Sequence, residues 1–281
     1  MGLADLLRAV FVGPPKPAVD PDAFSAAMAE RLRAARPAAE VRVDAPLGLT
    51  LIERGSERAL HLDGLYRRVL ATHEVGEREA AAADWIGAAC SAAPEERATA
   101  DDIVPLLASP DGEPGRPGHA HAGLDAATPG EWLNPCLRVV YAVDTPHGAV
   151  EVPPSWFAAR GVDPAGLRRR AVANLRATLP GLHVQRGGGL NVVIAGGRHE
   201  SALLLFDEFW ARERPRLRGD ALVAVPARDV LLFCDGAKAK AVDELRRQAA
   251  SIHADAAFPL TPVVFLRHAD GRVEPVDARA F

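Results

Sequence analysis

Two short stretches of the chain carry charged and aromatic side chains of the kind that bind other molecules. Asp207, Glu208 and Trp210 follow an apolar run. Arg228 and Asp229 form a charged pair at the turn between two apolar strands. Arginine and tryptophan are the usual anchors of protein-binding surfaces, so these residues are predicted to contact another polypeptide. The competing interpretation is a plain hairpin turn, in which Asp229 bonds its own backbone and pairs with Arg228.

Metal and catalytic sites are not predicted. His199 and Glu200 have side chains that bind metals, as do Asp207 and Glu208. If the run at 202–206 is one strand, these two pairs lie at its opposite ends, about 16 Å apart. One ion cannot bind both pairs, and no serine lies in a Gly-x-Ser-x-Gly motif. We therefore expect no metal, no cofactor and no catalytic residue.

Two glycine-rich stretches, 187–189 and 196–197, are the most enzyme-like features of the sequence. A phosphate-binding loop lies between a strand and the start of a helix, whereas both stretches here precede predicted strands. Glycines that supply positive φ at hairpin turns are the favoured interpretation. The alternative is a small-molecule or nucleotide-binding enzyme of hydrolase type, which would use these loops together with Arg228 and Asp229.

Two arginine-rich runs, 168–170 and 212–218, are interspersed with acids or lie on predicted helix exteriors. Solvated helix faces explain them without a ligand. The net charge of −4 over 281 residues gives no general case for nucleic acid as a partner.

Composition indicates a cytoplasmic protein. The hydrophobic share of 48% with 25% charged residues is typical of a globular chain. The three cysteines are far apart in the sequence and odd in number, which favours reduced thiols over a disulfide framework. No apolar run reaches the length of a membrane span, and the acidic start Met1–Asp5 does not resemble a signal peptide.

The chain also contains a weak internal repeat. When Asp20–Tyr66 is placed over Asp163–Phe209 without a gap, 12 of 47 positions are identical, against about 4 expected at an arbitrary offset. Each copy begins with an aspartate–proline helix start and an apolar spacing of four. Three short strands are predicted to follow in each copy, the third of them at 202–206 in the second copy.

These patterns predict an α+β protein of two related units, each a helix, three strands and a helix with an antiparallel sheet. The first unit is expected at 1–107, a Pro/Gly-rich linker at 108–130 and the second unit at 131–281. A first unit that only supports the second is a further possibility.

The C-terminal half resembles the YtpQ-type family of bacterial proteins, whose function is uncharacterised. The likeness rests on Asn134-Pro135, on 139–144, on Gly187–Gly197 and above all on Gly219–Phe233. It implies a bacterial cytosolic protein and supplies no activity and no catalytic residues. The element order of this half is also similar to that of type III secretion chaperones, an analogy at the level of the fold. The sequence thus favours a non-enzymatic, chaperone-like protein-binding module whose partner is another polypeptide or a second copy, with no nucleic acid and no membrane.

Overall fold

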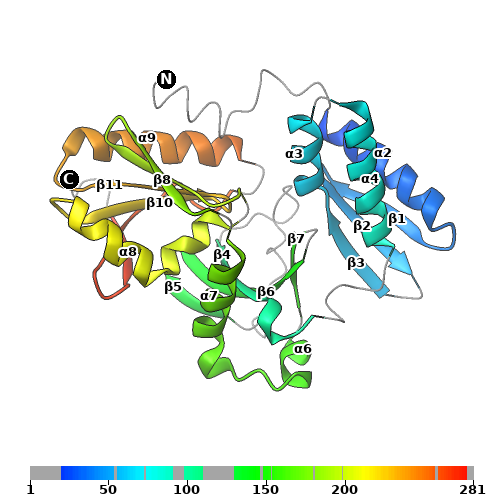
Figure 1. Cartoon of the computed structure of the whole chain (residues 1–281), viewed down its shortest axis with the longest axis horizontal. Coiled ribbons are helices and arrows are strands. Elements are labelled where there is room, and N and C mark those ends of the chain that lie inside the picture. Colours follow the sequence, from blue (N-terminus) through cyan, green and yellow to red (C-terminus); the bar gives the residue numbers. More distant parts are fainter. Residues whose placement is uncertain are drawn as a thin grey trace.

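The computed structural model of this protein (Figure 1) describes most of the chain in ten stretches. They are residues 20–53, 56–72, 74–90, 98–109, 130–145, 148–152, 154–179, 181–197, 199–256 and 259–276. Their strands form three sheets, and the strand pairs are antiparallel. The predicted α+β class is confirmed.

The first unit is a three-stranded sheet covered by helices. Its elements are α2 (Pro21–Ala35), β1 (Glu40–Ala45), β2 (Gly48–Glu53), β3 (Ser56–His61), α3 (Asp63–Ala71) and α4 (Val75–Ala89). The sheet has the order β1-β2-β3. As predicted, Asp20 caps α2: its side chain accepts a hydrogen bond from the backbone N–H of Ala23 at 3.0 Å. Apolar side chains of α2 and α4 pack on the sheet in a core drawn only from residues 24–90.

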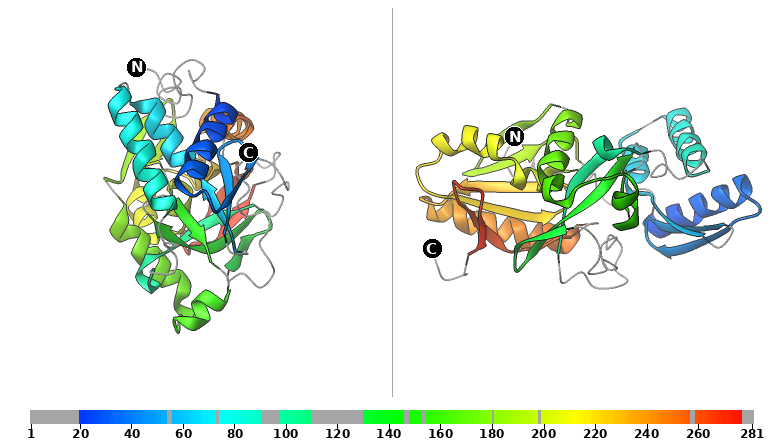
Figure 2. Two further views of the ribbon diagram at one scale, coloured as in Figure 1. Left: turned by 90° about the vertical axis from the view of Figure 1, so that its right-hand side faces the viewer. Right: turned by 90° about the horizontal axis from the view of Figure 1, so that it is seen from below.

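A six-stranded sheet with the order β13-β12-β10-β11-β9-β8 lies at the centre of the second unit. Its strands are β8 (His183–Gly187), β9 (Leu190–Ile194), β10 (Ala221–Ala227), β11 (Val230–Asp235), β12 (Val264–Arg267) and β13 (Val273–Pro275). The helix α9 (Ala239–Asp255) covers one face with an apolar stripe of its side chains. The 3₁₀ segment η3 (Glu200–Leu205) and the helix α8 (Asp207–Glu213) pack on the other face. Figure 2 (right), which views the molecule of Figure 1 from below, shows α8 and α9 on opposite sides of the sheet.

A second sheet in this unit is built around β6. It consists of β4 (Ile103–Ala108), β5 (Gly130–Asn134), β6 (Leu137–Thr145) and β7 (Gly148–Glu151), and the other three strands all pair with β6. The helix α7 (Leu167–Thr178) packs on β4, and η3 contacts β4 as well. The remaining elements are η1 (Ala100–Asp102), α6 (Pro154–Ala159), η2 (Pro164–Gly166) and η4 (Arg214–Arg216).

The predicted division of the chain at residue 107 is wrong, because it cuts through β4. All six residues of β4 are buried, and each pairs with a residue of β6. Most of the predicted linker lies outside the described residues, yet its two ends join β4 and β5, which belong to one sheet. It is therefore a connection inside the second unit. That unit begins at or before residue 98, since Arg160 donates a hydrogen bond to the carbonyl of Ala98 at 3.0 Å.

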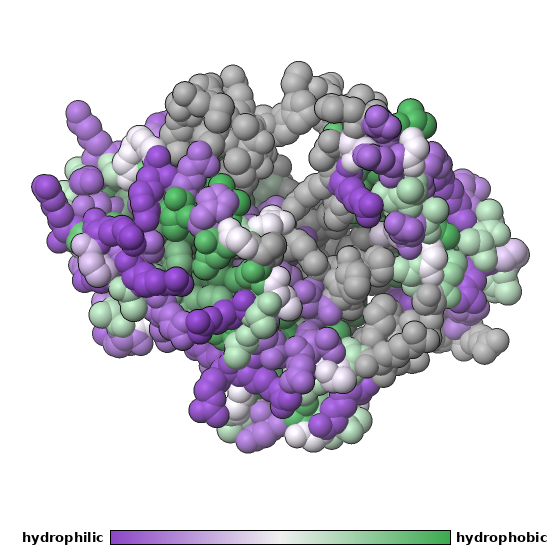
Figure 3. Space-filling model, in the orientation of Figure 1, coloured by the Kyte–Doolittle hydropathy of each residue, from purple (hydrophilic) through white to green (hydrophobic). Residues whose placement is uncertain are grey.

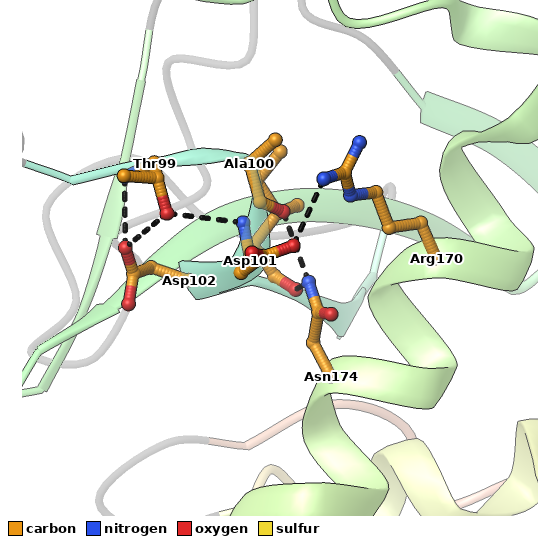
Figure 4. Close-up of polar contacts among 7 residues, drawn as sticks. Thr99, Ala100, Asp101, Asp102, Arg170 and Asn174 are labelled. Atoms are coloured by element: carbon orange, nitrogen blue, oxygen red, sulfur yellow. Dashed lines mark hydrogen bonds and ion pairs between the residues drawn. The ribbon is translucent and has the colours of Figure 1, made fainter.

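Figure 4 shows how the turn before β4 is tied to α7. Asn174 of α7 donates hydrogen bonds to the carbonyl oxygens of Ala100 and Ile103, at 3.0 and 2.9 Å. Arg170 of the same helix pairs with Asp101 at 2.8 Å. Thr99 and the η1 acids complete a capping box that holds the turn.

The two copies of the predicted repeat share the element order of a helix followed by a hairpin, and they differ at the predicted third strand. Residues 202–206, predicted as a strand, lie in η3 and in the residue after it. The strand that pairs with β9 in place of the predicted third strand is β11, which comes later in the chain. The helix packing also differs between the two copies. The helix α2 packs on β1, the strand that follows it, whereas α7 packs on β4, a strand that precedes it in the chain. The three-stranded meander therefore occurs once, in the first unit.

Candidate functional site

Trp210, predicted as an exposed anchor, is a core residue. Its side chain is 3% exposed and packs edge-on against the rings of Phe209 and Phe233. The indole N–H donates to the carbonyl of Leu203 at 3.1 Å, so its polar group is satisfied inside the protein. The prediction of Trp210 as a contact residue is wrong, because packing between η3 and the central sheet buries it.

Asp207 neutralises a buried arginine next to this tryptophan. Arg267 is 4% exposed, and its guanidinium donates to Asp207 Oδ1 at 2.5 Å and lies 5.0 Å from the centroid of the Trp210 ring. Burial lowers the pKa of Arg267, and the neighbouring carboxylate of Asp207 opposes that shift. Asp207 thus stabilises the fold at the start of α8.

Arg228 and Asp229 lie far from this pair. They form the turn between β10 and β11, where the carbonyl of Arg228 accepts hydrogen bonds from the backbone N–H and the hydroxyl of Ser201. Arg267 pairs across from Ala221, at the opposite end of β10. The length of that strand separates the two groups by about 20 Å. The predicted residues therefore do not gather into one site.

The glycine stretch at 196–197 encloses a carboxylate of the protein itself. Glu200 is 2% exposed, and its side chain accepts hydrogen bonds from the backbone N–H groups of Ala195, Gly197 and His199, at 2.9, 2.6 and 3.1 Å. Converging amides of this kind are what a phosphate needs. Because Glu200 already accepts from these three amides, they are not available to a phosphate.

The other glycine stretch serves packing. Gly188 and Gly189 have positive φ at the turn between β8 and β9, as predicted for hairpin glycines. A Cβ on Gly189 would lie only 3.1 Å from Cβ of Ala241, at the start of α9. Both glycine stretches therefore have structural reasons for their composition.

His199 is a buried histidine beside a carboxylate. Its Nε2 lies 3.4 Å from Asp144 Oδ1 of β6, and Nδ1 has no hydrogen-bond partner in the part of the chain that the structure describes. A histidine oriented by a carboxylate can act as a base. The ring is only 6% exposed, however, and the nearby hydroxyl of Ser201 donates to the Arg228 carbonyl. The contact between Asp144 and His199 joins β6 to the start of η3.

The outer side of β8 is an edge of the central sheet. β8 is an end strand of the central sheet, with no strand beyond it among the described residues. Leu179, Leu182 and Val184 are partly exposed while they pack against the core between the central sheet and α8. Figure 3 shows hydrophobic side chains grouped in this region, left of centre, within a mostly hydrophilic surface.

Ion pairs frame these apolar side chains. Arg176, in the last turns of α7, pairs with Glu208 of α8 at 2.6 Å. Arg186 of β8 pairs with Glu213 of α8 at 2.7 Å, and the buried Glu213 carboxylate also accepts from Arg216. We call this group of α7, β8 and α8 side chains the β8 surface. An apolar centre with an arginine-rich rim is the usual anatomy of a protein interface. Its members are Arg176, Leu179, Leu182, Val184, Arg186, Glu208, Arg212, Glu213 and Arg216.

Of the predicted contact residues, only Glu208 belongs to the β8 surface. The other members were not predictable, because Leu182 and Val184 cannot be told from ordinary strand residues until the order of the sheet is known. One available signal was the arginine-rich composition of the stretch that surrounds them.

Other kinds of site find no support in the described residues. They contain no group of three or more histidine, cysteine or acidic side chains placed to hold a metal ion. None of their helices combines the length and apolar character that crossing a membrane requires. Cys90, Cys136 and Cys234 form no disulfide. Burial, and to a lesser extent the charge of the neighbouring Asp235, raises the pKa of the Cys234 thiol to about 12.

No family model, curated protein or solved structure matches this chain. The resemblance to the YtpQ-type family and the likeness in element order to type III secretion chaperones therefore stay predictions.

Proposed function

We propose that this protein is a cytoplasmic, non-enzymatic module that binds an extended segment of another polypeptide along the open edge of β8. The observation that carries the proposal is the coincidence of two features: the edge of β8, which is unpaired among the described strands, and the partly exposed apolar side chains of Leu179, Leu182 and Val184. The three free cysteines support a reducing compartment.

Strand addition is the recognition mode that fits this surface. An edge strand presents backbone N–H and C=O groups that a peptide can pair with, and neighbouring apolar side chains then select alternate residues of the peptide. β8 carries no proline, and its register with β9 is regular, without a bulge. Prolines and bulges are features that natural edge strands often use to prevent pairing, and β8 has neither.

The alternative, a phosphate-binding or nucleotide-binding enzyme, has less support. The amides of Ala195, Gly197 and His199 already donate to Glu200. Arg228 and Asp229 lie at a turn whose carbonyl at Arg228 accepts hydrogen bonds from Ser201. A thermal-shift assay with nucleotides distinguishes this alternative from the peptide-binding proposal. Stabilisation by a nucleotide that Arg228→Ala abolishes would favour the enzyme.

Binding of a labelled peptide tests the proposal. We expect the alternating peptide Thr-Val-Thr-Val-Thr-Val-Thr-Val to bind saturably and to slow amide hydrogen exchange at 183–187. Val184→Lys should weaken binding by about tenfold, because a lysine on the edge opposes strand addition. Val43→Lys is the matched control, since Val43 lies on β1, the edge strand of the other unit, and is 40% exposed.

Two results would contradict the proposal. One is peptide binding without protection of 183–187, and the other is equal loss of binding in the Val43 and Val184 variants. Self-association that depends on concentration and is lost in Val184→Lys would identify the bound segment as part of a second copy.

A further inference from the structure

The charge of the chain is unevenly distributed, and its basic part surrounds the β8 surface. Residues 167–218 contain ten arginines and four acidic residues, a net charge of +6. The rest of the chain has 23 basic and 33 acidic residues, a net charge of −10. A local excess of this size sets the electrostatic potential that an approaching ligand meets.

The four acids of this stretch are already bound to partners. Glu200 is buried against backbone amides, and Glu213 is buried between Arg186 and Arg216. Asp207 pairs with Arg267, and Glu208 pairs with Arg176. Beyond these pairs, Arg212 is exposed and donates to a backbone carbonyl. The rim of the β8 surface is therefore positively charged.

The side chains of the β8 edge form a fixed order on one face of the sheet. Leu182 and Val184 both pack against the core on the α8 side. Arg186 points to the same side, since it reaches Glu213 of α8 and Asn191 of β9. A strand paired with β8 places every second side chain on this face. It meets two apolar side chains and then a guanidinium.

We propose that the segment bound at β8 carries two apolar residues at alternate positions and a carboxylate at the next alternate position. This inference rests on the proposed function and names the chemistry of its partner. The apolar residues cover Leu182 and Val184, and the carboxylate lies beside Arg186 within reach of the rim arginines. Charge complementarity of this kind adds specificity and speeds association.

A polypeptide fits this surface better than a nucleic acid does. Recognition at an unpaired strand edge depends on backbone amides, which phosphates and bases do not reproduce. Single strands of nucleic acid are usually held by exposed aromatic rings. The described residues expose one large aromatic side chain, Trp132, and it lies on β5 of the other sheet.

The test compares peptides that differ at one position. The probes are Thr-Val-Thr-Val-Thr-Glu-Thr and its reverse, Thr-Glu-Thr-Val-Thr-Val-Thr, which serve parallel and antiparallel pairing. Each is compared with versions that carry glutamine or lysine in place of glutamate. We expect a glutamate peptide to bind about fivefold more tightly than its glutamine version, and the lysine version to bind most weakly. The preference should shrink as salt rises from about 0.05 M to about 0.5 M.

Variants of the rim assign the effect to this surface. Arg186→Gln should remove the preference for glutamate. Because Arg186 also neutralises the buried Glu213, the exposed Arg176→Gln is the second variant and should reduce the preference. Arg31→Gln is the matched control, since Arg31 of α2 also pairs with a glutamate of another helix, at 2.8 Å.

The outcomes separate this inference from the proposed function. Equal binding of the glutamate and glutamine peptides, with amide protection at 183–187, overturns the inference and leaves the function standing. Absence of peptide binding at 183–187 overturns both. Displacement of the glutamate peptide by a single-stranded oligonucleotide at lower concentration than by the unlabelled peptide overturns the assignment of the partner as a polypeptide.

Discussion

Asp235 and Glu200 are buried carboxylates around which neighbouring loops fold. Asp235 ends β11, and its side chain accepts hydrogen bonds from the backbone N–H groups of Arg218, Gly219 and Ala237, at 3.2, 2.8 and 3.1 Å. Glu200 binds three amides in the same way. Acidic residues that sequence patterns offer as ligands for metals or substrates are here ligands for the protein's own backbone. Composition alone cannot distinguish these roles, because both need a carboxylate beside a flexible loop.

Asp235 should make stability depend on pH. Burial alone raises the pKa of this carboxyl, but the three backbone hydrogen bonds outweigh burial and hold the pKa below its ordinary value. A carboxyl whose pKa is lower in the folded state contributes stability above its unfolded pKa of about 3.9. That contribution is lost as the pH falls through the folded value. In Asp235→Asn we expect a loss of about 1–3 kcal/mol at neutral pH.

Urea unfolding of the wild type and Asp235→Asn over a series of pH values measures this effect. The free energy of unfolding of the wild type should fall more steeply below about pH 5 than that of the variant. Asp243→Asn is the control, because Asp243 is an exposed residue of α9. Parallel pH dependences for wild type and Asp235→Asn would show that the three hydrogen bonds do not stabilise the charged form.

The turn between β8 and β9 packs against the start of α9. Gly189 has a φ of +88°, and a side chain there would meet Ala241 at 3.1 Å. Gly189→Ala should therefore lower the free energy of unfolding by about 1–3 kcal/mol. Gly87→Ala should raise it by about 0.5–1 kcal/mol, since Gly87 lies inside α4 with open space around its Cα.

Denaturant unfolding of both glycine variants measures whether each substitution lowers or raises the free energy of unfolding. An unchanged or more stable Gly189→Ala would mean that the hairpin adjusts its turn at no cost. The tight packing of the β8–β9 hairpin against α9 would then not fix the position of β8.

Elements with a local signal were predictable, and elements defined by distant partners were not. The hairpin of β10 and β11 follows from two apolar runs around a polar turn, and α9 follows from its apolar stripe. The run at 202–206 was mistaken for a strand because it is buried on all sides between two sheets. A short apolar run has no periodicity that separates a strand from a buried helical turn.

β4 and the β8 surface show why other elements could not be predicted from the sequence. β4 contains Pro105, which argues against a central strand, and the structure places β4 at the end of its sheet, where a missing N–H is tolerated. That β8 is an edge strand depends on pairing between β9 and β11, about 40 residues apart in the sequence. Site prediction failed at Trp210 for the same reason, since its burial depends on Phe233.

The whole molecule consists of two bodies with separate cores. The first core draws on residues up to 90, and the others begin with β4 and its neighbours. Figure 1 shows the first body at the right, apart from the sheets of the second. The first body is acidic, with 12 acidic and 9 basic residues in 20–90, while the basic excess described above lies around β8.

The second body should fold without the first, provided that β4 is kept. A chain that begins at Ala98 retains the pairing of β4 with β6 over six positions and the two hydrogen bonds from Asn174. A chain that begins at Ser109 loses a strand that is buried along its whole length and exposes the α7 face that packs on it. Burying six such residues contributes on the order of 10 kcal/mol, comparable with the whole stability of a domain. We expect a cooperative thermal transition and the native near-ultraviolet circular dichroism for the first chain, and neither for the second. Equal folding of both chains would show that β4 is dispensable and would place the boundary back at residue 107.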